Sequence, residues 1–119
     1  MSNQIEPPKL NKIYCMDCVK GMREYIPNES VDVIVTSPPY NIGIKYNSHK
    51  DNMPFDKYLS WMEEVAKECF RVLKNNGSFF FNIGDKPSDE LRSLKVAERI
   101  IKIFKLQNTI HWVKSIAVP

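Results

Sequence analysis

The sequence has 119 residues, of which 43% are hydrophobic and 26% charged, enough for one modest domain with a core and too few for two. Its net charge of +3 permits a nucleic-acid partner without indicating one. It contains no apolar run of the roughly 18 residues that a membrane span needs, and residues 1–12 lack the apolar core of a signal peptide. We therefore expect a cytoplasmic protein that has no membrane partner.

The cysteines indicate a reducing compartment. Cys15, Cys18 and Cys69 are odd in number and do not form a disulfide framework. Cys15 and Cys18 make a CxxC pair, but no second pair follows, and the two histidines, His49 and His111, are distant in sequence. No metal site is predicted, and the pair is interpreted as two small residues near the start of a helix.

The first predicted elements are a short strand at residues 12–15 and a helix at 17–26 with Asp17 as its N-cap. Turn residues at 27–30 lead to a β-branched run at 31–35, which is typical of a parallel strand covered on both faces. Thr36-Ser37-Pro38-Pro39-Tyr40 follows this strand directly. The polar loop at 41–53 comes next and is longer than a structural connection needs, which favours a functional role.

In the second half, apolar residues at helical spacing predict a helix from Pro54 to Leu73, with Gly77 closing it. Residues 78–83 are predicted to form a buried strand that ends in Gly84-Asp85. Ser88 is the predicted N-cap of a helix that reaches Phe104, and residues 106–113 are a third strand candidate. This order predicts an α/β fold, a partial Rossmann-like sheet of mostly parallel strands with helices on both faces. Ligands bind beyond the carboxyl ends of such strands, so residues 36–40 and 82–85 should share one rim.

The residues that follow the strand at 31–35 suit a planar ligand with an amino group. Two successive prolines stop the strand and hold a stiff turn, because proline has a fixed φ and no backbone N–H. The Ser37 hydroxyl and the Pro38 carbonyl are acceptors for two amino hydrogens, and the Tyr40 ring offers a stacking face. Such acceptors would favour attack by a poorly nucleophilic base amine and bear its developing positive charge. A turn with a packing tyrosine is the structural alternative.

The segment from Ser37 to Tyr40 resembles motif IV, [DNS]-P-P-[YFW], of amino-methyltransferases that use S-adenosylmethionine. The surroundings are similar to the class of DNA methyltransferases in which this motif lies near the N-terminus. The resemblance covers nearly the whole chain, in an ordered series at residues 13–18, 30–41, 71–77, 81–85 and 110–114. It implies an enzyme that methylates the exocyclic amino group of a flipped base in double-stranded DNA.

The resemblance also implies roles for single residues. Ser37, Pro38 and Tyr40 would be catalytic with Pro39 as scaffold, and serine in the first position favours cytosine N4 over adenine N6. Asp17, Cys18 and Ser37 would contact S-adenosylmethionine, while Asp17 could equally be only a helix cap. In the loop, the residues expected to contact DNA are Lys45, Tyr46, His49 and Lys50. The structural alternative is a solvated loop in which these side chains make no specific contact.

Three further positions lie near the predicted rim. Trp112 and Lys114 match a later motif that would wall the target base, with ordinary packing as the alternative. Asn82 is assigned no catalytic role, and neither is Asp85.

The family's glycine-rich cofactor loop, F-x-G-x-G, has no counterpart among the four glycines of this chain. We therefore expect residues 1–119 to be the catalytic half of a methyltransferase domain, without the cofactor-loop half and the target-recognition region. A missing C-terminal half or a complementary chain would be its partner, and the isolated chain should be inactive. Two alternatives stay open. One is an amide methyltransferase that acts on protein or RNA, although such enzymes normally place the glycine-rich site ahead of the PPY. The other is a non-catalytic module that binds a base without methylating it.

Overall fold

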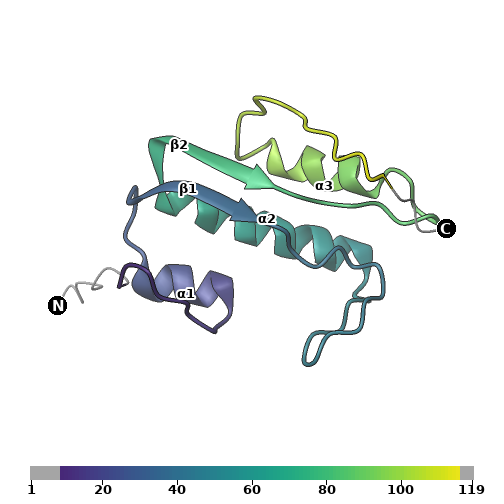
Figure 1. The fold of residues 1–119 in the computed structure, drawn as a ribbon, viewed down its shortest axis with the longest axis horizontal. Coiled ribbons are helices and arrows are strands. Elements are labelled where there is room, and N and C mark those ends of the chain that lie inside the picture. Colours follow the sequence, from purple (N-terminus) through teal and green to yellow (C-terminus); the bar gives the residue numbers. More distant parts are fainter. Residues whose placement is uncertain (1–8, 116–119) are drawn as a thin grey trace.

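The structure is a computed structural model that describes residues 9–115. The N-terminal residues that enter the signal-peptide prediction, 1–8, and residues 116–119 lie outside this range. The described chain forms α1 (Cys18–Tyr25), β1 (Val31–Thr36), α2 (Phe55–Val72), β2 (Leu73–Phe81) and α3 (Arg92–Ile100) (Figure 1). No helix in the described part is long and apolar enough to cross a membrane.

The two strands lie side by side and parallel, as predicted. Ile34 pairs with Phe79 and Thr36 with Phe81, and α2 is the crossover between the strands. A register shift falls between Val31 and Val33, where β2 carries Gly77. A Cβ at Gly77 would lie 3.0 Å from the Asp32 carbonyl oxygen and 2.9 Å from that of Lys74, so the close approach of backbone at this irregularity requires glycine.

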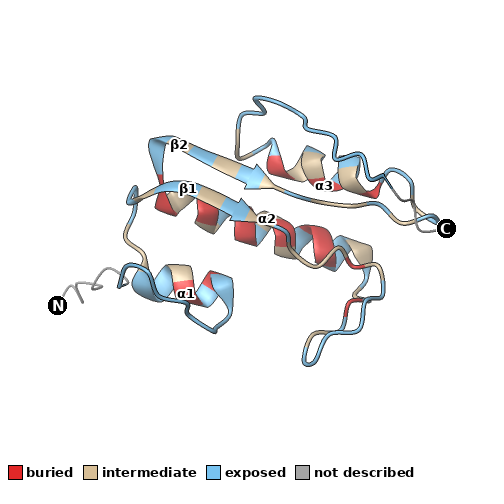
Figure 2. Ribbon diagram, in the orientation of Figure 1, coloured by how far each residue is buried: buried red, intermediate tan, exposed pale blue. Residues whose placement is uncertain are grey.

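The core is built around α2, in which buried residues recur along the length of the helix (Figure 2). Tyr58 and Met62 are fully buried, and Val19 of α1 and Val96 of α3 pack into the same cluster. The sheet contributes three partly buried side chains to this cluster, which are those of Ile34, Phe79 and Phe81. The described helices therefore cover one face of the sheet.

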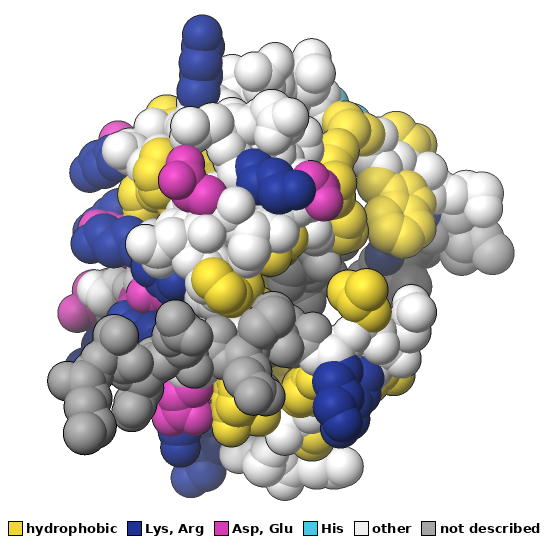
Figure 3. Space-filling model, turned by 90° about the vertical axis from the view of Figure 1, so that its left-hand side faces the viewer, with side chains coloured by type: hydrophobic (Ala, Val, Ile, Leu, Met, Phe, Trp, Pro, Cys, Tyr) yellow, Lys and Arg dark blue, Asp and Glu magenta, His cyan; other side chains and the backbone are white. Residues whose placement is uncertain are grey.

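The other face of the sheet is open. Val33, Val35 and Phe80 point away from α2 by strand alternation and keep 53%, 75% and 49% of their surface exposed. The expectation of helices on both faces is thus wrong for the described residues, because α1 packs on α2 and α3 lies on the α2 side. Figure 3 shows one end of the molecule, where Lys, Arg, Asp and Glu side chains gather mainly along one side.

Two predicted strands are absent from the described residues. Residues 12–15 and 106–113 are not assigned to any strand, and Ile13 and Val113 are 95% and 86% exposed. A strand needs a neighbour to satisfy its backbone, and neither segment has one here.

Two helix boundaries also differ from the prediction. Gly77 does not close α2, because β2 begins at Leu73, directly after the helix. Ser88 is not an N-cap, since residues 86–91 form turns and α3 begins at Arg92. The Asp85 carboxylate instead accepts a hydrogen bond from the Ser93 N–H at 2.6 Å, which satisfies a free donor of the first turn.

Candidate active site at the carboxyl ends of the strands

The segment Ser37–Tyr40 and the end of β2 meet at one rim of the sheet, as predicted. Because β1 and β2 are parallel and in register at Thr36 and Phe81, the next residue of each strand comes to the same edge. The Asn82 N–H donates to the Thr36 carbonyl at 2.9 Å and extends the ladder by one bond. Asn82 is therefore placed beside Ser37 by the sheet itself.

Three side chains form a hydrogen-bonded triangle at this rim. The Ser37 and Tyr40 hydroxyls lie 2.8 Å apart, and the Asn82 amide nitrogen donates to the Tyr40 hydroxyl at 2.8 Å and to the Ser37 hydroxyl at 3.3 Å. Sequence reasoning identified Ser37 and Tyr40 but gave Asn82 no role. The signal that could have found it is its position directly after a strand parallel to β1.

The two prolines direct their carbonyls differently. The Pro39 carbonyl accepts a hydrogen bond of 2.6 Å from the Tyr58 hydroxyl, which α2 holds in the core. Burial, reinforced by the nearby Asp51 carboxylate, raises the pKa of Tyr58, so this hydroxyl remains a donor. The Pro38 carbonyl accepts no hydrogen bond from the described residues. Tyr58 thus anchors one carbonyl and leaves the preceding one available.

Gly84 lies against the Tyr40 ring. A Cβ built on Gly84 would lie 2.9 Å from Tyr40 Cε2 and 3.0 Å from Cδ2, closer than side-chain carbons pack. The φ of Gly84 is not positive, so glycine is needed here for the close approach and not for its backbone conformation. One side of the ring is therefore in contact with backbone from the β2 end.

Asp51 closes the loop at 41–53 into a compact turn. Its buried carboxylate accepts hydrogen bonds of 2.9–3.1 Å from four successive backbone N–H groups, those of Asn41, Ile42, Gly43 and Ile44. Asn41, with a φ of 59°, adds two hydrogen bonds of 2.8 Å to the backbone of Met53. Burial opposes ionisation of Asp51, but the four donors outweigh it and lower the pKa of its carboxyl.

The residues expected to contact DNA lie in this loop, which projects from the body of the molecule (Figure 1). Lys45 and Lys50 face each other in an antiparallel bridge and are exposed, as is Tyr46. His49 is only half-buried, with its ring 5.3 Å from that of Trp61 and its Nε2 3.8 Å from the Asp51 carboxylate. The structure brings all four residues to one hairpin, outside the Ser37–Tyr40–Asn82 triangle.

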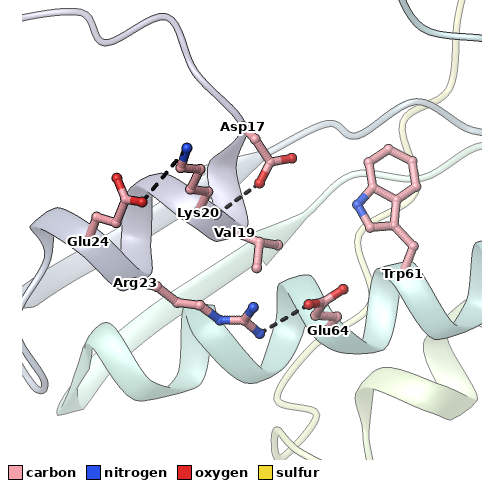
Figure 4. A pocket seen from close by; sticks show the side chains of 7 residues that line it. All are labelled: Asp17, Val19, Lys20, Arg23, Glu24, Trp61 and Glu64. Carbon is pink, nitrogen blue, oxygen red and sulfur yellow. Dashed lines mark hydrogen bonds and ion pairs between the residues drawn. The ribbon is translucent and has the colours of Figure 1, made fainter.

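Asp17 and Cys18, the expected cofactor contacts, begin α1. The Asp17 carboxylate accepts the Lys20 N–H at 2.8 Å, so its predicted N-cap role is confirmed. Burial and the neighbouring Asp17 raise the pKa of the Cys18 thiol. A cavity of about 370 Å³ lies between α1 and α2 (Figure 4). Asp17 lines it together with Trp61 and the Arg23–Glu64 ion pair, whereas Cys18 does not.

Trp112 and Lys114 do not reach the site in the described structure. Both are exposed, with Trp112 at 77%, and no hydrogen bond or ion pair of the described residues involves Lys114. No group of three or more His, Cys, Asp or Glu side chains suited to a metal ion occurs between residues 9 and 115.

The described residues form a parallel α/β unit with Ser-Pro-Pro-Tyr at the end of β1, and comparison with known proteins identifies the family. Residues 31–119 match the model of the family described as DNA methylase, N6_N4_Mtase, and the chain belongs to this family. It is 44% identical over 93 residues to the type II methyltransferase M.MjaVI of Methanocaldococcus jannaschii, covering 73% of this chain and 47% of that protein. It is 46% identical over 89 residues to the DNA adenine methyltransferase YhdJ of Escherichia coli K12, covering 73% and 28%.

Among solved structures, the chain resembles PvuII DNA methyltransferase, described as cytosine-N4-specific. The TM-score is 0.57 at 26% identity, over 75% of this chain and 32% of that one. The resemblance extends to the mixed α/β fold, whereas a full Rossmann-like sheet is not present in the described residues. The chain thus spans about half or less of the length of these relatives.

Proposed function

We propose that the rim formed by Ser37, Pro38 and Tyr40 is the methyl-acceptor site of a DNA methyltransferase that acts on the exocyclic amino group of a flipped base. The observation that carries this proposal is the meeting of the Ser37 hydroxyl, a Pro38 carbonyl without a described partner and the Tyr40 ring at the carboxyl end of β1. Membership of the DNA methylase family supports it.

The chemistry follows from the electronic state of a base amine, whose nitrogen lone pair is delocalised into the ring. The Ser37 hydroxyl and the Pro38 carbonyl would accept hydrogen bonds from the two amino hydrogens. These bonds would favour a pyramidal nitrogen and stabilise the positive charge that develops on the base as the nitrogen attacks. Tyr40 would receive the base by stacking. Tyr58 contributes by fixing Pro39, and with it the stiff turn that presents the Pro38 carbonyl.

S-adenosylmethionine would supply the methyl group as an electrophilic methyl on a sulfonium. The cavity at α1 has groups that suit its nucleoside part. One Asp17 oxygen caps Lys20 and the other accepts no hydrogen bond from the described residues, so it can accept from a ribose hydroxyl, and Trp61 offers a flat apolar surface. The resemblance extends this site to Cys18 and Ser37.

Two elements would complete the enzyme. The exposed hairpin with Lys45, Tyr46, His49 and Lys50 would contact phosphates of double-stranded DNA or close over the flipped base. A C-terminal half or a complementary chain would supply the glycine-rich cofactor loop and cover the open sheet face at Val33 and Val35. Residues 1–119 would be the catalytic half of the domain, which acts in the cytoplasm.

Cytosine N4 is the proposed target. Serine in the first motif position supports it, and the related PvuII enzyme carries the name cytosine-N4-specific. Adenine N6 is the second candidate, supported by the relative YhdJ, whose name is DNA adenine methyltransferase.

The test is methyl transfer in trans. The chain is mixed with the part of M.MjaVI that it does not match, S-adenosylmethionine labelled on the methyl group and unmethylated plasmid DNA, and the DNA is digested to nucleosides for mass spectrometry. Labelled N4-methylcytosine is expected, and N6-methyladenine would redirect the target. If no labelled base forms although the two parts co-purify as a complex and the complete M.MjaVI methylates the same DNA, the chain is a non-catalytic binding module.

A further inference from the structure

We propose that Asn82 is a positioning residue for the acceptor site and that Gly84 packs against one edge of the Tyr40 ring, so that the end of β2 sets the geometry of the motif on β1. This inference rests on the proposed function. It concerns two residues of the β2 end, Asn82 and Gly84, which we call the β2 clamp.

The side chain of Asn82 starts from a fixed backbone position. Its N–H is bonded to the Thr36 carbonyl at 2.9 Å, so the sheet ladder sets where its side chain begins. From there the amide reaches the Tyr40 hydroxyl at 2.8 Å and the Ser37 hydroxyl at 3.3 Å. A site held by a strand end is more rigid than one held by loop residues alone.

The protons of the triangle decide which acceptor positions of Ser37 stay free. A hydroxyl has one proton and two acceptor positions. If Tyr40 donates to Ser37, then Tyr40 and Asn82 fill both acceptor positions of Ser37, and none is left for a base amine. If Ser37 donates to Tyr40, Ser37 keeps one acceptor position, while Tyr40 accepts from both Ser37 and Asn82. The acceptor role of Ser37 therefore depends on the Tyr40 hydroxyl, which is the group that Asn82 holds at the shorter distance.

Gly84 contacts one edge of the Tyr40 ring. Any side chain at this position would place its Cβ 2.9 Å from Tyr40 Cε2, and the ring would have to move. Asn82 fixes the hydroxyl end of Tyr40, and Gly84 fixes the ring near its edge. Together they hold the Tyr40 ring at its hydroxyl and along one edge.

Asn82 is also exposed and contributes nothing to the buried core, so its truncation should leave folding intact. The expected effect is on the reaction. Misplacement of reacting groups by about 1 Å can lower a rate by about 100-fold, so we expect kcat to fall by about 10- to 100-fold in Asn82→Ala. KM for S-adenosylmethionine should change much less than kcat, because Asn82 does not line the cavity between α1 and α2 that is proposed to hold the nucleoside part.

The kinetic test uses the full chain complemented in trans as above. Asn82→Ala is compared with Asn76→Ala, the same chemical change at an exposed position near the amino end of β2, which should keep the wild-type kcat and KM. In a Tyr40→Phe background the Asn82→Ala change should cost little more, because the hydroxyl it positions is gone. Wild-type kcat in Asn82→Ala, or losses that simply multiply in the double variant, would overturn the proposal.

A second measurement does not depend on activity. In the isolated chain, NMR should show the Asn82 side-chain amide protons shifting in Tyr40→Phe, and the Tyr40 ring resonances shifting in both Asn82→Ala and Gly84→Ala. Asn76→Ala should leave these signals in place. Unchanged signals in the first three variants would refute the clamp even if the enzyme is active. Signals that shift in an enzyme with no activity would instead count against the proposed function alone.

Discussion

Asp51 offers the sharpest test of how the loop beside the acceptor site is held. Its side chain is fully buried and its two oxygens accept four backbone N–H groups, one on Oδ1 and three on Oδ2. Asp51→Asn keeps the shape but replaces one oxygen by an NH₂ group. With the amide oxygen toward the three donors, the new NH₂ would face the buried N–H of Asn41.

The magnitude follows from these contacts. An orphaned buried donor costs about 1–3 kcal/mol, and the three remaining bonds lose the added strength of a charged acceptor. Relief of the desolvation of a buried carboxylate offsets part of this loss. We expect the free energy of unfolding to fall by about 3 kcal/mol, a large part of the roughly 5–15 kcal/mol that stabilises a domain.

The pH dependence gives the prediction a sign. The pKa of Asp51 is lowered by folding, so its contribution is fully present above the unfolded value of about 3.9 and is lost as the pH falls through the lower folded value. The stability gap between wild type and Asp51→Asn should therefore be constant near neutral pH and shrink below about pH 4.

The assay is urea unfolding followed by circular dichroism across this pH range. Asp56→Asn is the matched control, since Asp56 is an exposed carboxylate in the first turn of α2 and its loss should cost at most about 1 kcal/mol. An Asp51→Asn loss no larger than that of the control, or a gap that does not shrink in acid, would refute the reasoning.

Three further predictions concern the scaffold and the binding of ligands by the isolated chain. Arg71→Ala should lower the free energy of unfolding by about 2–3 kcal/mol in urea titrations, because the Arg71 guanidinium donates hydrogen bonds to the Met22 and Ile26 carbonyls at the end of α1. Lys67→Ala removes only an exposed ion pair, and an Arg71→Ala loss as small as that of Lys67→Ala would contradict this prediction. Cys69 should stay unreactive toward a thiol reagent at pH 8 until the chain is unfolded, because burial raises its pKa to about 12, and labelling of Cys69 in the folded chain would disprove it. Isothermal titration calorimetry of the isolated chain should show only weak binding of S-adenosylmethionine and of DNA, and low-micromolar affinity for the cofactor would contradict the need for a second half.

The sequence was most informative where one local pattern was sufficient. The β-branched run at 31–35 and the helical spacing from 54 onward predicted β1 and α2 closely. The boundary at Gly77 was wrong because Lys74-Asn75-Asn76 has the composition of a turn, yet these exposed residues continue β2. Their place in the strand depends on pairing with β1 across a register shift, which no local pattern records.

The strand predictions at 12–15 and 106–113 failed for a related reason. Residues with strand-forming composition become a strand only beside a partner, and the described sheet has β1 and β2 alone. The same two-strand sheet leaves Val33, Val35 and Phe80 exposed, although the apolar run had predicted burial on both faces.

The candidate site was predicted in part. Ser37 and Tyr40 could be identified because their chemistry and their place after a strand are both local. Asn82 and Gly84 were placed on the same rim but given no catalytic role, because their contacts with Tyr40 appear only once the register places the β2 end against its ring. Tyr58 lies on the buried face of the predicted helix, but its hydrogen bond to Pro39 depends on how α2 crosses the rim.

The most direct test of the central claim is transfer of labelled methyl groups from S-adenosylmethionine to DNA by the complemented chain, comparing wild type with Ser37→Ala and Tyr40→Ala. Asn76→Ala again serves as the control for folding and complementation. The account predicts that wild type and the control methylate DNA at the same rate and that both site variants lose transfer. Transfer at the wild-type rate in either site variant would contradict the assignment of the acceptor site to the carboxyl end of β1.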